Sequence, residues 1–167
     1  MAPQLIPPTT AVRESFLQAA ADLRGEGWLP HFPLEQASAD FASYVAAERA
    51  VTLAWDVPTT VLWYVDAETY LGTAVIRHQL TEALRLLGGN LGYHVAPRQR
   101  RRGHATRMVG EALGVCADLG MAQVLITCRV DNVPSRRVIE ANGGLLAEVA
   151  DGECHYWVTT HPSGQPG

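Results

Sequence analysis

Apolar side chains recur at three- and four-residue intervals in several segments of the chain, which is the spacing of one face of an α-helix. The clearest stripe begins at Ala105 and ends at Leu119, where Gly120 follows as a stop signal. The predicted helices cover residues 11–23, 34–50, 81–87, 105–119 and 132–142.

Other segments are rich in β-branched and aromatic residues, which favour strands. A hairpin turn at residues 66–69 joins the first two of these segments, whereas helices separate the strands that follow residue 91. This order predicts a mixed α/β fold in which the strands around residues 93 and 127 run parallel. Residues 1–9 are predicted to be irregular or an edge segment. The predicted strands cover residues 60–65, 70–76, 91–95, 124–130, 145–150 and 155–159.

Length and composition indicate one domain. The chain has 167 residues, of which 47% are apolar and 18% charged, and a domain of this size buries roughly 70% of the surface of its unfolded chain. We expect a single domain over residues 1–161 and a disordered tail over residues 162–167. The sequence has neither a run of about 20 apolar residues nor the start of a signal peptide. We therefore expect a cytoplasmic protein without a membrane partner.

Charge and cysteine content argue against several functions. Thirteen basic residues stand against seventeen acidic ones, a formal net charge of -4, which disfavours a nucleic-acid partner. All the basic residues are arginines, so a lysine nucleophile or a P-loop lysine is excluded. Cys116, Cys128 and Cys154 form no metal-ligand spacing with the histidines, and we predict neither a metal site nor a disulfide.

Residues 95–108, V-A-P-R-Q-R-R-R-G-H-A-T-R-M, carry the most informative pattern, because a strand stops at a proline and a basic loop leads into a helix. A helix N-terminus presents unpaired backbone N–H groups and the positive end of the helix dipole. Gly103 would let the backbone approach an anion, Ala105 stays small, and Thr106 can offer a hydroxyl. The pattern predicts a phosphate or pyrophosphate site, although on composition alone the five arginines of this stretch suit a solvated loop equally well.

Residues 100–105, R-R-R-G-H-A, fit the (Gln/Arg)-x-x-Gly-x-(Gly/Ala) motif of the GNAT superfamily of N-acetyltransferases. Residues 132–135, N-V-P-S, and 140–143, E-A-N-G, resemble the start and end of a later helix in that family. The resemblance implies an α/β fold with a mixed, mostly antiparallel central sheet of six to seven strands and about four flanking helices. It also implies a parallel pair of strands at an acetyl-CoA cleft.

The resemblance further implies that the loop amides hold the pyrophosphate of acetyl-CoA, the acetyl donor, and that the end of the preceding strand binds its pantetheine arm. Asn132 suits the N-cap of a helix equally well, and the two roles are compatible. The residues assigned to acetyl-CoA binding are Val95, Arg100, Arg101, Arg102, Gly103, His104, Ala105, Thr106, Asn132 and Ser135.

The catalytic residues are harder to assign, because Ile139 stands where the family often has a tyrosine that protonates the leaving thiolate. Tyr156 and Tyr93 are the candidates for this acid, Tyr156 because its strand is expected to face the cleft. The strand at residues 91–95 has no carboxylate to act as a general base. His94, His78 and His155 are alternatives, and a well-oriented amine can also lose its proton to water.

The sequence thus predicts transfer of an acetyl group from acetyl-CoA to a primary amine by direct attack. The alternative is a non-catalytic acyl-CoA-binding or regulatory module. The acceptor is expected to be a small-molecule or peptide amine, and dimerisation is left open. Residues 26–82 carry eight acidic and two basic side chains, so we expect a cationic acceptor, although these charges also suit a solvated helix face.

Overall fold

The computed structural model describes residues 2–30 and 32–163, which form six α-helices, two short 3-10 helices and eight strands. The first half comprises β1 (Gln4–Ile6), η1 (Thr10–Val12), α1 (Arg13–Gly25), α2 (Leu34–Ala39), α3 (Phe41–Arg49), β2 (Thr52–Ala54), β3 (Val57–Asp66) and β4 (Thr69–Arg77). The second half comprises α4 (Glu82–Leu86), β5 (Leu91–Val95), η2 (Pro97–Gln99), α5 (His104–Asp118), β6 (Gln123–Arg129), α6 (Val133–Ala141), β7 (Leu145–Ala150) and β8 (Glu153–Thr159).

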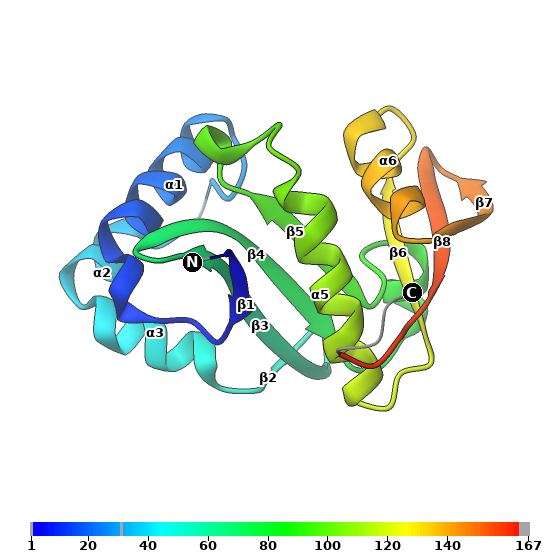
Figure 1. Ribbon diagram of the computed structural model, residues 1–167, viewed down its shortest axis with the longest axis horizontal. Coiled ribbons are helices and arrows are strands. Elements are labelled where there is room, and N and C mark those ends of the chain that lie inside the picture. Colours follow the sequence, from blue (N-terminus) through cyan, green and yellow to red (C-terminus); the bar gives the residue numbers. More distant parts are fainter. Residues whose placement is uncertain (1, 31, 164–167) are drawn as a thin grey trace.

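The strands form two antiparallel sheets. In the larger sheet β3 pairs with β1, β2 and β4, and β4 pairs with β5. The smaller sheet has the order β6-β8-β7. Helix α5 runs between the two sheets in the view of Figure 1 and contacts β4, β5 and β6. The mixed, mostly antiparallel α/β fold expected from the sequence is confirmed, with its strands divided between two sheets.

The two sheets touch just before β5. The N–H of Asn90 donates to the carbonyl of Leu125 over 2.8 Å, and the N–H of Leu125 donates to Oδ1 of Asn90 over 2.9 Å. No ladder joins β5 to β6 within the described residues. The expected parallel pair is therefore limited to this contact, and the two strands separate beyond it.

Strand alternation divides the interior between the two faces of the larger sheet. Tyr64 of β3 belongs to the core that α5 covers, whereas its neighbour Trp63 belongs to the core under α1 and α3. Phe16 of α1 stacks on Trp63 with a ring-centroid distance of 4.4 Å. Helices α1 and α3 thus cover one face of this sheet, and α5 covers the other (Figure 1).

One predicted helix, over residues 34–50, is divided into α2 and α3. Asp40 has a non-helical φ of -140°, and its Oδ1 accepts the N–H of Ser43 over 3.1 Å, so that it caps α3. Strand β2 was missed, and the segment before residue 10 contains the short edge strand β1.

The end of the chain was predicted to be disordered from residue 162. Ser163 instead donates its hydroxyl to Oδ2 of Asp118, over 2.9 Å, at the end of α5. Residues 164–167 of that predicted tail lie outside the described residues. Within the described ranges, no helix combines the length and apolarity that a membrane span requires.

We expect Gly89→Ala to lower the free energy of unfolding by about 2–4 kcal/mol. Its φ is +59°, and a Cβ there would clash with the backbone carbonyl of Leu125, which cannot move without parting the sheets. Gly120→Ala is the matched control, because Gly120 has a φ of +85° and nothing within 4 Å of the added Cβ. Urea denaturation of both variants separates the clash from the backbone strain. Equal losses would show that the junction of the sheets tolerates an added methyl group.

Candidate active site

Unpaired backbone N–H groups gather at the start of α5. Arg101 and Gly103 have φ angles of 61° and 77°, and this left-handed turn leads the chain into the helix. Gly103 is the N-cap, and no side chain caps α5. Among the described residues, no protein acceptor takes the N–H groups of residues 101–106. A helix start of this kind favours a bound anion.

Strand β5 has an open edge beside this loop. It pairs with β4 from Leu91↔Ile76 to Val95↔Gly72, but no strand in the described part of the chain pairs with its other edge. The free N–H and C=O groups of such an edge can pair with an extended ligand chain. Val95 is the last residue of this edge, before the loop that leads into α5.

Two arginines of this loop, Arg98 and Arg100, are bound to carboxylates at the end of α1. Nε of Arg98 donates to Oδ2 of Asp22 over 2.7 Å, and Arg100 donates two hydrogen bonds to the carboxylate of Glu26, over 3.1 and 3.0 Å. The hydrogen bond from Arg98 lowers the pKa of Asp22. These two side chains therefore fasten the loop to the end of α1, and Arg100, which was assigned to acetyl-CoA, is held by Glu26.

The remaining basic residues of the loop lie closer to the helix start. Nη1 of Arg102 donates to the Gln99 side chain over 3.1 Å, and Nη2 of Arg107 donates to the carbonyl of Arg102 over 2.9 Å. Partial burial and the charges of these two arginines lower the pKa of His104. Its imidazole is therefore neutral at neutral pH, and the backbone, rather than this ring, supplies the positive potential.

Tyr93 of β5 spans the separation between β5 and α6. Its hydroxyl lies 2.7 Å from Oγ of Ser135. Ser135 is itself held by the helix start, because its N–H donates to Oδ1 of Asn132 over 3.2 Å. Asn132 is thus an N-cap, one of the two roles that the sequence allows. Burial raises the pKa of Tyr93 to about 12, and the hydrogen bond to Ser135 opposes this shift.

Cys128 of β6 lies near the same pair. Its pKa is raised to about 11, chiefly by burial and then by the neighbouring Cys154, whereas a hydrogen bond from Ser135 lowers it. The thiol is therefore protonated at neutral pH, which disfavours its use as a nucleophile.

Tyr156, the other candidate acid, is hydrogen-bonded to two side chains of α6. Its side chain is 1% exposed, its hydroxyl donates to Oε1 of Glu140 over 2.7 Å, and it accepts a hydrogen bond from Nε of Arg136 over 3.2 Å. The expectation that Tyr156 faces the cleft is corrected, because the smaller sheet turns this side chain toward α6.

The three candidate histidines are hydrogen-bonded to protein groups. His94 lies on the opposite face of β5 from Tyr93, with Nε2 at 3.1 Å from the hydroxyl of Tyr70. Burial, and then the charge of Arg100, lower its pKa to about 4. His78 bonds Thr60, and His155 bonds the carbonyl of Leu86 and the Glu148 side chain. These three rings are not gathered around the Tyr93–Ser135 pair.

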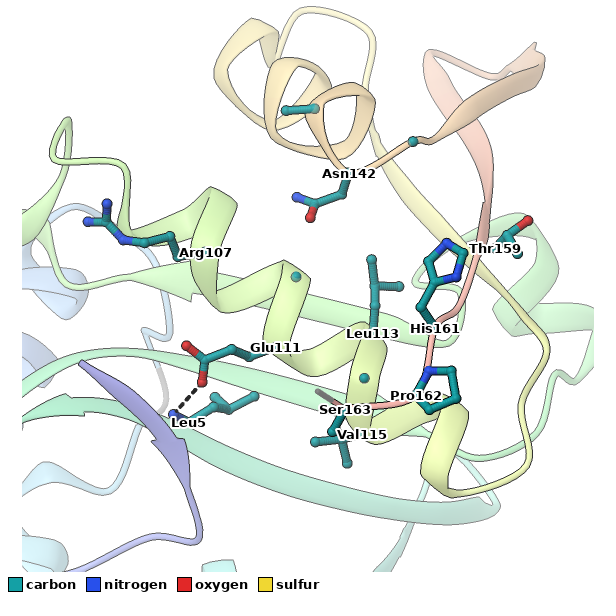
Figure 2. A pocket seen from close by; sticks show the side chains of 14 residues that line it. Leu5, Arg107, Glu111, Leu113, Val115, Asn142, Thr159, His161, Pro162 and Ser163 are labelled. Atoms are coloured by element: carbon teal, nitrogen blue, oxygen red, sulfur yellow. Dashed lines mark hydrogen bonds between the residues drawn. The ribbon is translucent and has the colours of Figure 1, made fainter. Parts of the chain in front are cut away.

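A large groove of about 870 Å³ lies along α5 and none of the predicted acetyl-CoA residues lines it. Figure 2 shows that its walls come from α5, the end of α6 and the chain after β8, with Glu111 accepting the N–H of Leu5 over 2.9 Å. Asn142 lines its upper end and donates to the carbonyls of Thr106 and Val138 over 3.2 and 2.9 Å. The sequence did not predict these hydrogen bonds between α5 and α6, because an Asn before two glycines is typical of the end of a helix.

The sequence matches the family model described as the acetyltransferase (GNAT) domain over residues 4–144. The chain therefore belongs to the GNAT acetyltransferases, as its motifs suggested. No curated protein is significantly similar to it in sequence.

Solved structures share the fold at low sequence identity. The structure of RimJ from Mycobacterium smegmatis, in complex with CoA-disulfide, has 17% identity and a TM-score of 0.68 over 94% of this chain and 81% of its own. The microcin C7 self-immunity acetyltransferase MccE, in complex with acetyl-CoA and AMP, has 15% identity and a TM-score of 0.65, with 94% and 92% covered. The acetyltransferase yncA from Salmonella typhimurium, with acetyl-CoA, has 13% identity and a TM-score of 0.59, with 100% and 99% covered.

We expect Gly103→Val to weaken CoA binding about tenfold or more, because a β-branched side chain at a φ of +77° displaces the backbone that leads into α5. Gly152→Val, at a φ of +79° with nothing within 4 Å of the added Cβ, imposes a similar strain far from this loop. Calorimetric titration with CoA, together with melting curves, compares the two variants. Equal CoA affinity in folded Gly103→Val and Gly152→Val would contradict the assignment of an anion site to this loop.

Proposed function

We propose that the protein is an N-acetyltransferase that moves the acetyl group of acetyl-CoA to a primary amine in a ternary complex. The observation that carries the proposal is the uncapped start of α5 next to the open edge of β5. One offers N–H groups to a pyrophosphate, and the other offers an extended hydrogen-bonding edge to a pantetheine arm. Structural neighbours that hold acetyl-CoA or CoA support acetyl-CoA as the donor.

Binding would involve the backbone of residues 101–106 at the pyrophosphate and Val95 at the pantetheine arm. Arg101 and Arg102 add charge there, while Arg100 holds the loop through Glu26. Ser135 faces the same space from α6, where Asn132 fixes the helix start.

The reaction is direct attack by the neutral amine on the thioester carbonyl. A C–N bond forms, the C–S bond breaks, and the proton lost by the amine passes to water. Backbone N–H groups near Val95 polarise the carbonyl, and positioning supplies much of the rate enhancement. Tyr93, which stays protonated at neutral pH, donates a proton to the leaving sulfur directly or through Ser135.

The second candidate function is a non-catalytic acyl-CoA-binding module. The observation that favours it is Ile139, which occupies the position of the usual acid and is fully buried. Release of free CoA thiol from acetyl-CoA in the presence of a panel of primary amines separates the two functions. Tight CoA binding without amine-dependent release would favour the binding module.

We expect Tyr93→Phe to lower kcat by about 10- to 100-fold with little change in KM, since a proton donor acts in the transition state. Tyr156→Phe is the matched control, because it also removes a tyrosine hydroxyl group, one that is hydrogen-bonded to Glu140 and Arg136. We expect this variant to be less stable and to retain its kcat. Steady-state kinetics and melting temperatures of both variants test this assignment. Unchanged kcat in Tyr93→Phe would leave solvent as the proton source.

We expect kcat/KM for a cationic acceptor to fall as ionic strength rises, since charges are screened over about 10 Å at 0.1 M salt. Of the eight acidic residues in positions 26–82, Glu26 and Glu35 are neutralised in ion pairs. The attraction therefore rests on the other six. The test is the salt dependence of kcat/KM for a polyamine acceptor, and turnover restricted to neutral or anionic amines would contradict it.

A further inference from the structure

A second cavity, of about 190 Å³, lies between the helices α1 and α3 and the opposite face of the larger sheet. This volume is well above the roughly 10–15 Å³ that one water molecule needs, so it can admit a chain of several heavy atoms. Leu29, which is 41% exposed, is among its lining residues. The cavity is separate from the groove of Figure 2, with which it shares no lining residue.

Aromatic rings make up much of the cavity wall. Phe16 contacts the other four, with centroid distances of 4.4 Å to Trp63, 4.9 Å to Tyr70, 5.5 Å to Tyr44 and 6.0 Å to Phe32. The faces of such rings carry negative potential and attract cations. The wall therefore suits an apolar chain that ends in a positive charge.

Glu48 is the only acidic residue that lines the cavity within the described part of the chain. It is partly buried, and burial raises the pKa of its carboxyl group. None of residues 2–30 and 32–163 forms a hydrogen bond or an ion pair with its carboxylate. The adjacent Arg49 is used elsewhere, since its Nε donates to the carbonyl of Pro8 over 2.6 Å.

The other polar groups of the wall do not neutralise this carboxylate. His94 has a pKa of about 4 and is uncharged at neutral pH. The hydroxyl of Tyr70 is shared with Thr73 and His94, at 2.5 and 3.1 Å. Burial raises the pKa of both Tyr70 and Tyr44, and the charge of Glu48 adds to this increase. A partly buried carboxylate with no partner among the described residues loses part of its hydration, and a cation that enters the cavity offsets this cost.

We propose that this cavity binds a primary alkylammonium group, with Glu48 as its counter-ion and the aromatic rings around its alkyl chain. His94 in the wall is followed in the chain by Val95, where the acetyl group is proposed to be held. If the protein is the acetyltransferase proposed above, on which this inference rests, the cavity is the specificity pocket for the acceptor.

The pocket-bound ammonium and the attacking amine are different nitrogen atoms. An ammonium held by Glu48 has no lone pair with which to attack a thioester. The side chains of His94 and Val95 also project from opposite faces of β5, so the cavity and the acyl site lie on different sides of this strand. The acceptor class is therefore an alkyl diamine, with one nitrogen bound in the cavity and the other acetylated.

Binding is tested first, without acetyl-CoA. Calorimetry at neutral pH compares n-butylammonium with 1-butanol, which has the same alkyl chain and no charge. We expect the ammonium to bind about tenfold more tightly to the wild-type protein, and we expect Glu48→Gln to abolish this preference. Glu14→Gln removes an exposed carboxylate from α1 and should retain the preference. Equal binding of ammonium and alcohol by the wild-type protein overturns the proposal without reliance on any variant.

Turnover is tested next with 1,4-diaminobutane and n-butylamine as acceptors. We expect kcat/KM to favour the diamine about tenfold in the wild type and in Glu14→Gln, and the preference to be lost in Glu48→Gln. Acetylation of both amines at equal kcat/KM overturns the proposed specificity pocket but agrees with the proposed acetyltransferase function. Selective ammonium binding without acetylation of any amine supports the site and contradicts the proposed function.

Discussion

The contact of Asn90 with Leu125 is the constraint on which the rest of the structure depends. It joins the two sheets at one end of β5 and β6, and no ladder continues it within the described residues. Strand β5 is therefore an edge strand on the side of β6. The space that opens there is spanned by Tyr93 and Ser135 and covered by α5, so that a loop, a strand edge and a helix start come together.

The helix starts of this protein differ in whether a side chain caps them. Thr81, Asp40 and Asn132 cap α4, α3 and α6 with their side chains. Helices α1, α2 and α5 begin without such a cap, and of these three α5 begins at a glycine with a left-handed φ of 77°. A carboxylate or hydroxyl at this position would occupy the N–H groups that an anion needs. The longest helix with the most apolar stripe can forgo a cap, because its buried face supplies its stability.

Much of the fold was predictable because it depends on local pattern. The apolar stripe predicted over residues 105–119 corresponds to α5, and the left-handed φ of Gly103 matches the glycine that the loop requires. The partners of Arg98 and Arg100 were not predictable, since Asp22 and Glu26 lie more than 70 residues away in sequence. Tyr156 shows the same limit. Alternation along β8 predicts which face of the strand the Tyr156 side chain lies on. Its hydrogen bonds depend on how α6 packs against that face, which the sequence does not show.

The ion pairs from Arg98 and Arg100 to α1 make that helix part of two environments. Asp22 of α1 and its C-cap residue Glu26 hold the loop before α5, while Phe16, Ala20 and Leu23 of α1 line the aromatic cavity. An occupant of the cavity that displaced α1 would therefore also move the carboxylates that hold the loop. Thermodynamic linkage makes such a coupling reciprocal, so an anion held by the loop changes the affinity of the cavity by the same factor. The order in which two ligands arrive is then a property of kinetics alone, since their joint free energy of binding is the same by either route.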